Sequence, residues 1–143
     1  MPTLQRFLDA QESTYPTALT EIQNGRKRSH WMWFIFPQLQ GLGLSETARF
    51  YAIQDTREAA AYLAHPVLGP RLVEICGALL ALDSTDANRI FGSPDDVKLR
   101  SSMTLFRAVP GASPVFGQVL ERFFGGVPDP RTLALLGGAT ETM

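Results

Sequence analysis

The sequence has little of what marks secreted and membrane proteins. Cys76 is its only cysteine, so no disulfide can form within the chain, and a reducing cytoplasm fits best. No stretch approaches the roughly 18 consecutive apolar residues of a membrane span. The N-terminus also lacks the basic start and apolar run of a signal peptide. We therefore expect a cytoplasmic protein with no membrane partner.

Net charge is nearly absent as well. The 143 residues include 13 Lys and Arg and 14 Asp and Glu, which gives a formal net charge of −1. A surface for DNA or RNA needs a field of basic groups, because these groups release counterions from the phosphates. We therefore expect no nucleic-acid polymer as a partner, and any anion site must be local.

Common signatures of catalysis are missing too. There is no G-x-x-x-x-G-K-[ST] phosphate loop and no G-x-S-x-G nucleophile elbow, and Gly41 and Gly43 lack the third glycine of a dinucleotide-binding turn. The soft metal donors are limited to His30, His65 and Cys76, which follow no recognised spacing. We therefore expect neither a metal nor a bound cofactor.

What the sequence does contain is a set of residues that favour the starts and ends of helices. A proline is favourable at the first helical position, which predicts helix starts at Tyr15-Pro16, Ser93-Pro94, Ser113-Pro114 and Asp129-Pro130. Glycines favour helix ends at Gly25, Gly92, Gly125 and Gly137. Asp55 followed by Glu58 resembles a capping box.

Hydrophobic periodicity agrees with these predicted helix starts and ends. Within residues 114–124, Phe116, Val119, Leu120 and Phe123 share one helical face, whereas residues 70–82 are apolar almost all round and predict a central helix. No alternating strand pattern is present. We predict an all-α fold, a compact multihelical single domain over residues 1–143 with about seven or eight helices. No heptad pattern points to self-association, so we expect a monomer.

The helix that starts at Ser93 carries a polar ridge. Lys98, Ser101 and Ser102 are related as i, i+3 and i+4 and are therefore neighbours on its surface. Because an unpaired buried ammonium is costly, Lys98 must either reach solvent or hold an anion or a carboxylate. The serines could equally bond to carbonyls one turn earlier. Asp96 is a candidate for proton transfer or, alternatively, for capping with Ser93.

The stretch SHWMWFIFPQ, residues 29–38, concentrates aromatic side chains. Such runs usually form core, because Trp and Phe bury large apolar areas. Yet His30, Trp31 and Trp33 each carry a ring nitrogen that needs a partner if buried, and Gln38 adds an amide. The stretch is thus either a core plug or the wall of a ligand pocket, and both interpretations stay open at this stage.

A basic run directly precedes this stretch. Arg26, Lys27 and Arg28 form either a solvated turn or the rim of an anion site. Cationic groups beside an aromatic surface are typical of proteins that hold nucleotides and flat heterocycles. The neighbourhood therefore favours a nucleotide-like ligand.

Four segments carry a resemblance to a known family. They are GRKRSHWMWFIFPQLQGLG, YLAHPVLGPRL, FGSPDDVKLRSSMTLF and the closing FFGG with TLALL. Together they resemble the bacterial family called domain of unknown function 1810, from about residue 4 to residue 136. The resemblance implies a helical fold and a cytoplasmic, monomeric domain, and it implies no established activity.

A fainter likeness concerns the order of AYLAHPVLGPRL, DDVKLRSSMTLF and a Phe-rich helix. This order is similar to that of NADAR domains, which act on N-glycosidic bonds of ADP-ribose-type or riboflavin-pathway compounds. The catalytic positions of that group have no match here, so the likeness implies only a ligand class.

Two hypotheses of different class follow. The first is a domain that binds an anionic nucleotide-like or ADP-ribose-like ligand, with N-glycosyl hydrolase activity as an added option. Its catalytic candidates are Asp96 and His30, and its ligand-binding candidates are Arg26, Lys27, Trp31, Trp33, Gln38, Lys98, Ser101 and Ser102. The alternative is a non-enzymatic interaction module that uses the aromatic stretch as a docking patch.

Overall fold

The structure, a computed structural model, describes residues 3–140 and side chains as far as Gly137. The prediction of an all-α fold is confirmed, and the only extended pairing in this range is an isolated bridge between Leu39 and Ile53. The described residues form nine helices: α1 (Gln5–Gln23), α2 (Met32–Ile35), α3 (Glu46–Tyr51), α4 (Thr56–Ala64), α5 (Leu68–Leu80), α6 (Ala87–Phe91), α7 (Asp95–Arg107), α8 (Val115–Phe124) and α9 (Pro130–Thr140). The count exceeds the expected seven or eight. Three of the nine helices, α2, α3 and α6, are only 4, 6 and 5 residues long, too short to be recognised from periodicity.

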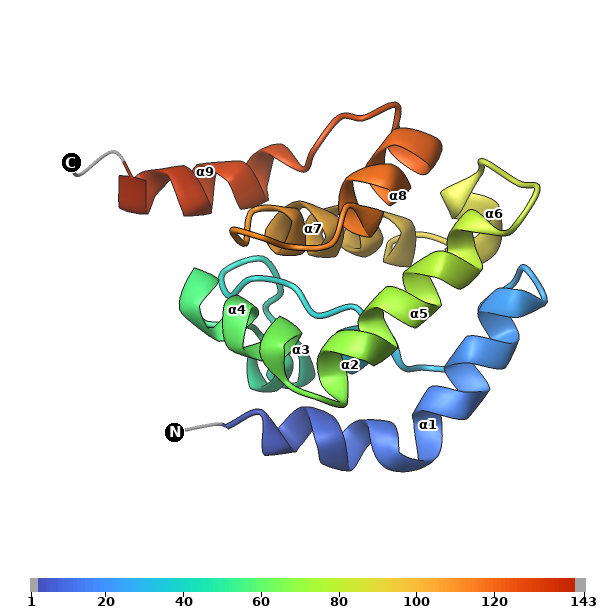
Figure 1. Cartoon of the computed structure of the whole chain (residues 1–143), viewed down its shortest axis with the longest axis horizontal. Coiled ribbons are helices and arrows are strands. Elements are labelled where there is room, and N and C mark those ends of the chain that lie inside the picture. The colour runs from blue at the N-terminus through green and yellow to red at the C-terminus, as the bar shows by residue number, and fades with distance from the viewer. Residues whose placement is uncertain (1–2, 141–143) are drawn as a thin grey trace.

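Helix α5 lies at the centre, as its apolar sequence predicts. It crosses the middle of the molecule, with α1 on one side and α7 and α8 on the other (Figure 1), and it packs against α1, α4 and α8. Helix α7 is the second central element, because it contacts α4, α6, α8 and α9. The predicted apolar face of α8 is confirmed, since all four of its members are buried: Phe116, Val119, Leu120 and Phe123.

Most predicted helix boundaries are confirmed. The Asp55 carboxylate accepts a hydrogen bond from the Glu58 backbone N–H at 2.8 Å and so caps α4. Pro130 is the first residue of α9, and Pro114 directly precedes α8. Gly125 ends α8 with φ 62°, a left-handed conformation that costs a glycine little.

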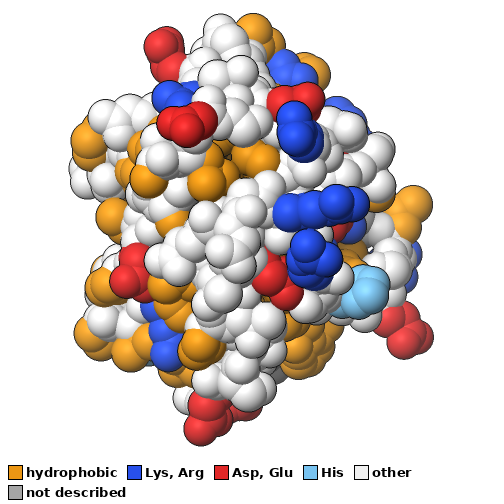
Figure 2. All heavy atoms as spheres, turned by 90° about the vertical axis from the view of Figure 1, so that its right-hand side faces the viewer, with side chains coloured by type: hydrophobic (Ala, Val, Ile, Leu, Met, Phe, Trp, Pro, Cys, Tyr) orange, Lys and Arg blue, Asp and Glu red, His pale blue; other side chains and the backbone are white. Residues whose placement is uncertain are grey.

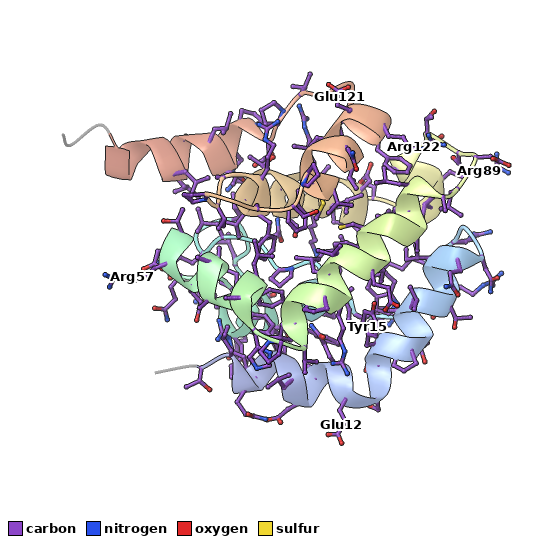
Figure 3. The ribbon with its side chains drawn as sticks, viewed as in Figure 1. Glu12, Tyr15, Arg57, Arg89, Glu121 and Arg122 are labelled. Carbon is purple, nitrogen blue, oxygen red and sulfur yellow. The ribbon has the colours of Figure 1, made fainter. Side chains whose placement is uncertain are left out.

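Two predicted boundaries are wrong. Pro16 lies inside α1 rather than at a helix start, and Figure 1 shows α1 bending sharply along its length. A proline inside a helix removes one backbone hydrogen bond and forces such a bend. The neighbouring Tyr15 hydroxyl donates to the Glu74 carboxylate at 2.5 Å and thereby ties the bent region to α5 (Figure 3). Gly137 lies within α9 instead of ending it.

Within residues 3–140, no single helix has both the length and the apolar content to cross a membrane. Helices α4 and α5 meet those limits only when taken together, across a bend of 87°.

The crossing of α4 and α5 depends on one glycine. A Cβ added to Gly69 would collide with the Leu63 carbonyl group, reaching 2.9 Å from its carbon. We expect Gly69→Ala to lower the free energy of unfolding by about 2–4 kcal/mol, because backbone rather than a flexible side chain must shift. Urea unfolding followed by circular dichroism measures this change.

The same helix offers a matched control. A Cβ at Gly77 would meet nothing within 4 Å. Gly77→Ala should therefore raise stability by about 0.5–1 kcal/mol, the ordinary gain from replacing a glycine inside a helix. Equal effects of the two substitutions would contradict the proposed collision.

Candidate functional site

A small cavity lies where α7, the loop of residues 38–43 and the start of α9 meet. Its volume is about 190 Å³, and we call it the Lys98 cavity. Its lining residues are Gln38, Leu42, Gly43, Pro94, Val97, Lys98, Ser101, Asp129 and Arg131.

Helix α7 and the proline before it supply one stripe of this lining. Pro94, Val97, Lys98 and Ser101 follow the spacing i, i+3, i+4 and i+7 and so share one face. The Ser101 hydroxyl donates to the Val97 carbonyl at 3.2 Å, which leaves its oxygen able to accept a further hydrogen bond. The structure thus brings three of the predicted site residues together, since Gln38 lines the same cavity.

Two larger hollows lie elsewhere. One of about 740 Å³ follows the outer surface of α8, where Figure 3 shows Glu121 and Arg122, and none of its lining residues is buried. Another of about 500 Å³ beside α5 contains no Lys, Arg or His in its lining. The Lys98 cavity differs because the polar residues Ser101 and Asp129 are buried and face it. Buried polar groups that converge on a cavity are the stronger sign of ligand recognition.

Trp33 extends the site beyond the cavity. Its half-buried ring lines a narrow hollow that shares Gln38 and Gly43 with the Lys98 cavity. The Lys98 Nζ lies 5.6 Å from the centroid of the Trp33 ring, within cation–π distance. One aromatic surface and one cation therefore stand side by side at the edge of the cavity.

Asp95 joins the two lysines of the basic and polar segments. Its Oδ2 lies 2.9 Å from Lys27 Nζ, and its Oδ1 lies 3.5 Å from Lys98 Nζ. Lys27 also donates to the Ser29 carbonyl at 2.6 Å, and its side chain is only 8% exposed. Its ammonium is therefore used in contacts within the protein rather than with a ligand. Lys98 holds a carboxylate, as one of the alternatives predicted, and its partly exposed ammonium has three donors in total.

Glu21 fixes the loop that carries this arrangement. Its buried carboxylate accepts hydrogen bonds from the Arg28 N–H at 2.7 Å, the Ser29 N–H at 3.0 Å and the Trp31 indole N–H at 2.9 Å, and also from the Ser29 hydroxyl. Burial raises the pKa of the Glu21 carboxyl, but the donated hydrogen bonds outweigh burial and lower that pKa to about 2.

The aromatic stretch divides between core and site. Trp31 is 0% exposed, and Met32, Ile35 and Phe36 are buried with it. Trp31 therefore contributes to the core and is sealed from a ligand, whereas Trp33 faces the site. This burial also removes most of the stretch from the surface, where a docking patch would have to lie.

Arg26 and His30 lie outside the lining of the Lys98 cavity. Both are exposed, on the side of the molecule where α1 ends, and Figure 2 shows Lys and Arg side chains gathered on this side. The structure therefore leaves Arg26 and His30 outside the lining, whereas Lys27 is connected to Lys98 through Asp95.

Asp96 and Ser102 are also absent from the lining. Asp96 accepts from the Asn88 amide at 3.3 Å and makes no capping bond with Ser93, because α7 has no side-chain cap. Ser102 is 0% exposed within the core. Its hydroxyl and Asp96 Oδ1 have no hydrogen-bond partner among residues 3–140.

Asp129 and Arg131 belong to the cavity but were not among the predicted site residues. Asp129 accepts from the Thr132 N–H at 2.8 Å and the Thr132 hydroxyl at 2.6 Å, so it caps α9 while its carboxylate borders the cavity. The only sequence signal was the pair Asp129-Pro130, which indicates a helix start and nothing about a ligand.

Metal binding finds no support in the part of the chain that the structure describes. No group of three or more His, Cys, Asp or Glu side chains in this part is placed to hold a metal ion. Cys76 is buried, and burial raises the pKa of its thiol, as expected of a core residue rather than a reactive one.

Comparison with known proteins identifies the family. Residues 1–136 match the family described as Protein of unknown function (DUF1810). The chain belongs to this family. The DUF1810 chain is also similar to the crystal structure of the conserved hypothetical protein Rv1873 from Mycobacterium tuberculosis, with 48% identity and a TM-score of 0.91 over 94% of this chain and 96% of that one. No curated protein matches the sequence.

The comparisons confirm the resemblance given by the four sequence segments. They do not test the likeness to NADAR domains, which stays a prediction. The site of this DUF1810 chain must therefore be interpreted from its own geometry.

The Glu21 network generates a pH-dependent prediction. Because folding lowers this pKa, the carboxylate stabilises the folded state above the ordinary value of 4.5, and the contribution is lost as the pH falls toward 2. Glu21→Gln should lower the free energy of unfolding by about 3 kcal/mol at pH 7. Urea unfolding at a series of pH values should show this difference shrinking below about pH 4.5.

Glu12→Gln provides the control, because Glu12 is exposed on the same helix and points away from the protein (Figure 3). It should change stability by less than about 0.5 kcal/mol at any of these pH values. A Glu21→Gln effect that does not depend on pH would contradict the role given to its charge.

Proposed function

We propose that this protein binds a small anionic, nucleotide-like molecule at the Lys98 cavity. The anionic group would lie at Lys98 and Arg131, and a flat ring would lie against Trp33. The observation that carries the proposal is the position of the Lys98 ammonium, which borders the cavity and also lies 5.6 Å from the Trp33 ring centroid.

Charge supports an anion at this position. Lys98 and Arg131 bring two positive charges to the lining, against the single carboxylate of Asp129. Arg131 is exposed, and its planar guanidinium suits a bidentate contact with a phosphate or carboxylate, whereas Lys98 acts as a point charge. Asp95 holds Lys98 in place, and Lys27 shares the negative charge of Asp95.

Size also limits the ligand. A cavity of about 190 Å³ is smaller than the roughly 300–1,000 Å³ typical of sites that enclose a drug-sized molecule. It suits one moiety, such as a sugar phosphate, with the rest of the ligand outside it. The hollow beside Trp33 is only about 10 Å³ and is too small for a base, so a base would lie against the half-buried Trp33 ring itself, because aromatic rings stack on bases without requiring a particular sequence of donors.

Hydrolysis of an N-glycosidic bond is a second candidate function for the same cavity. Such a reaction passes through a cationic sugar and uses a nearby carboxylate. Asp129 is the carboxylate in the lining, whereas Asp96 and His30, the residues predicted for proton transfer, lie outside it. Release of free base from AMP or nicotinamide mononucleotide, followed by chromatography, would support this candidate, and intact nucleotide after prolonged incubation would exclude it for these substrates.

A thermal-shift measurement with AMP, nicotinamide mononucleotide and ADP-ribose tests binding. A ligand at 100 times its Kd stabilises the folded state by about 2.7 kcal/mol and should raise Tm by roughly 5–10 °C. Trp33→Ala and Lys98→Ala should each remove most of this shift, because they delete the ring surface and the cation. Trp31 is unsuitable for this test because its truncation would open a hole in the core.

Arg57→Ala is the matched control. Arg57 is an exposed cation on α4 and extends into solvent (Figure 3), outside the lining of the Lys98 cavity. This variant should keep the full shift. The absence of a shift with every nucleotide, or its equal loss in Arg57→Ala, would overturn the proposal.

A further inference from the structure

We infer that the ligand of the Lys98 cavity carries hydroxyl groups as well as an anionic group, and that Asp129 recognises a hydroxyl. The ligand class is therefore a sugar phosphate rather than an anion without hydroxyl groups, such as a simple phosphate ester or a flat carboxylic acid. This inference rests on the proposed function, in which the cavity binds an anionic group. It adds that the same ligand carries hydroxyl groups.

The Asp129 carboxylate is held in a fixed position. Asp129 as a whole residue is 6% exposed, and its Oδ2 accepts from both the N–H and the hydroxyl of Thr132. The Asp129 N–H donates to the Thr104 hydroxyl oxygen at 2.8 Å, and that hydroxyl donates to the Arg100 carbonyl at 2.8 Å. Backbone and side chain are thus both anchored, which is how a protein keeps a recognition group in one geometry.

The second carboxylate oxygen is the one available to a ligand. None of the hydrogen bonds of Asp129 with other described residues involves Oδ1. Neither Lys98 nor Arg131 forms an ion pair with Asp129, although all three line the same cavity. Asp129 lines the cavity, and an ionised carboxylate oxygen can only accept, so a group that meets Oδ1 there must be a hydrogen-bond donor.

An anion without hydroxyl groups cannot supply that donor. A phosphate placed directly against Asp129 would instead meet a like charge, which is unfavourable at short range. A ligand with separate anionic and hydroxyl ends satisfies both parts of the cavity, with the anionic end at Lys98 and Arg131 and a hydroxyl at Asp129. The Ser101 oxygen, which retains accepting capacity, gives a second position for a hydroxyl on the same lining.

Isothermal titration calorimetry with two probes tests this inference. The probes are D-ribose 5-phosphate and methyl phosphate at pH 8, where both phosphate monoesters are dianions without a P–OH group, so they share the anionic group and differ in the sugar hydroxyls. The unsubstituted protein should bind ribose 5-phosphate at least about tenfold more tightly than methyl phosphate. Asp129→Asn should weaken ribose 5-phosphate binding by about 10–100-fold and leave methyl phosphate binding unchanged or tighter, because it removes a negative charge.

The substitution keeps the structural role of Asp129. Asparagine is as good a helix cap as aspartate, so its side-chain oxygen can still accept from Thr132 while its amide group faces the cavity. Asp86→Asn is the matched control, because Asp86 caps α6 by accepting from the Arg89 N–H at 3.2 Å and is absent from the cavity lining. It should leave both affinities unchanged, and thermal melting checks that each variant folds.

The outcomes separate the two proposals. Equal affinity of the unsubstituted protein for both probes, or an equal loss of both in Asp129→Asn, overturns the hydroxyl inference while methyl phosphate binding still supports an anion site. Absence of binding by either probe, with AMP also producing no thermal shift, overturns the proposed function and the inference together.

Discussion

The carboxylate of Glu21 is the constraint on which the candidate site depends. Four donors from the loop after α1 converge on it, so the chain from Arg28 to Trp31 has one conformation. That conformation places Trp31 in the core and leaves Lys27 against Asp95. Asp95 in turn orients Lys98 at the edge of the cavity. A buried charge of this kind is tolerated because its hydrogen bonds replace those it made to water.

The fold could be predicted from the sequence to a large extent, because helical periodicity and helix capping are local properties. The apolar face of α8, the central position of α5 and the Asp55 cap of α4 all follow from residues within a few positions of one another. The prediction for Pro16 was wrong because a proline can either start a helix or bend one. Only packing decides between these two outcomes. The short helix α2 has too few residues to show a period.

The site was only partly predictable, because it depends on contacts between distant segments. Gln38, Lys98 and Ser101 were identified as polar groups in apolar surroundings, and they do meet. Ser102, however, stands about 100° round the helix from Ser101 and enters the core, a difference that spacing alone could not decide. Asp129 was missed because its sequence context is that of an ordinary helix cap.

The bridge between Leu39 and Ile53 has a consequence for how the cavity meets a molecule from solution. Gln40 donates to the Ile53 carbonyl and Ile53 donates to the Gln38 carbonyl, each at 2.8 Å, so the backbone on both sides of Leu39 is pinned to the segment before α4. This wall is already ordered before anything binds. Little conformational entropy remains to be lost there on association. The entropic cost of binding is therefore smaller than it would be if a disordered loop had to become ordered.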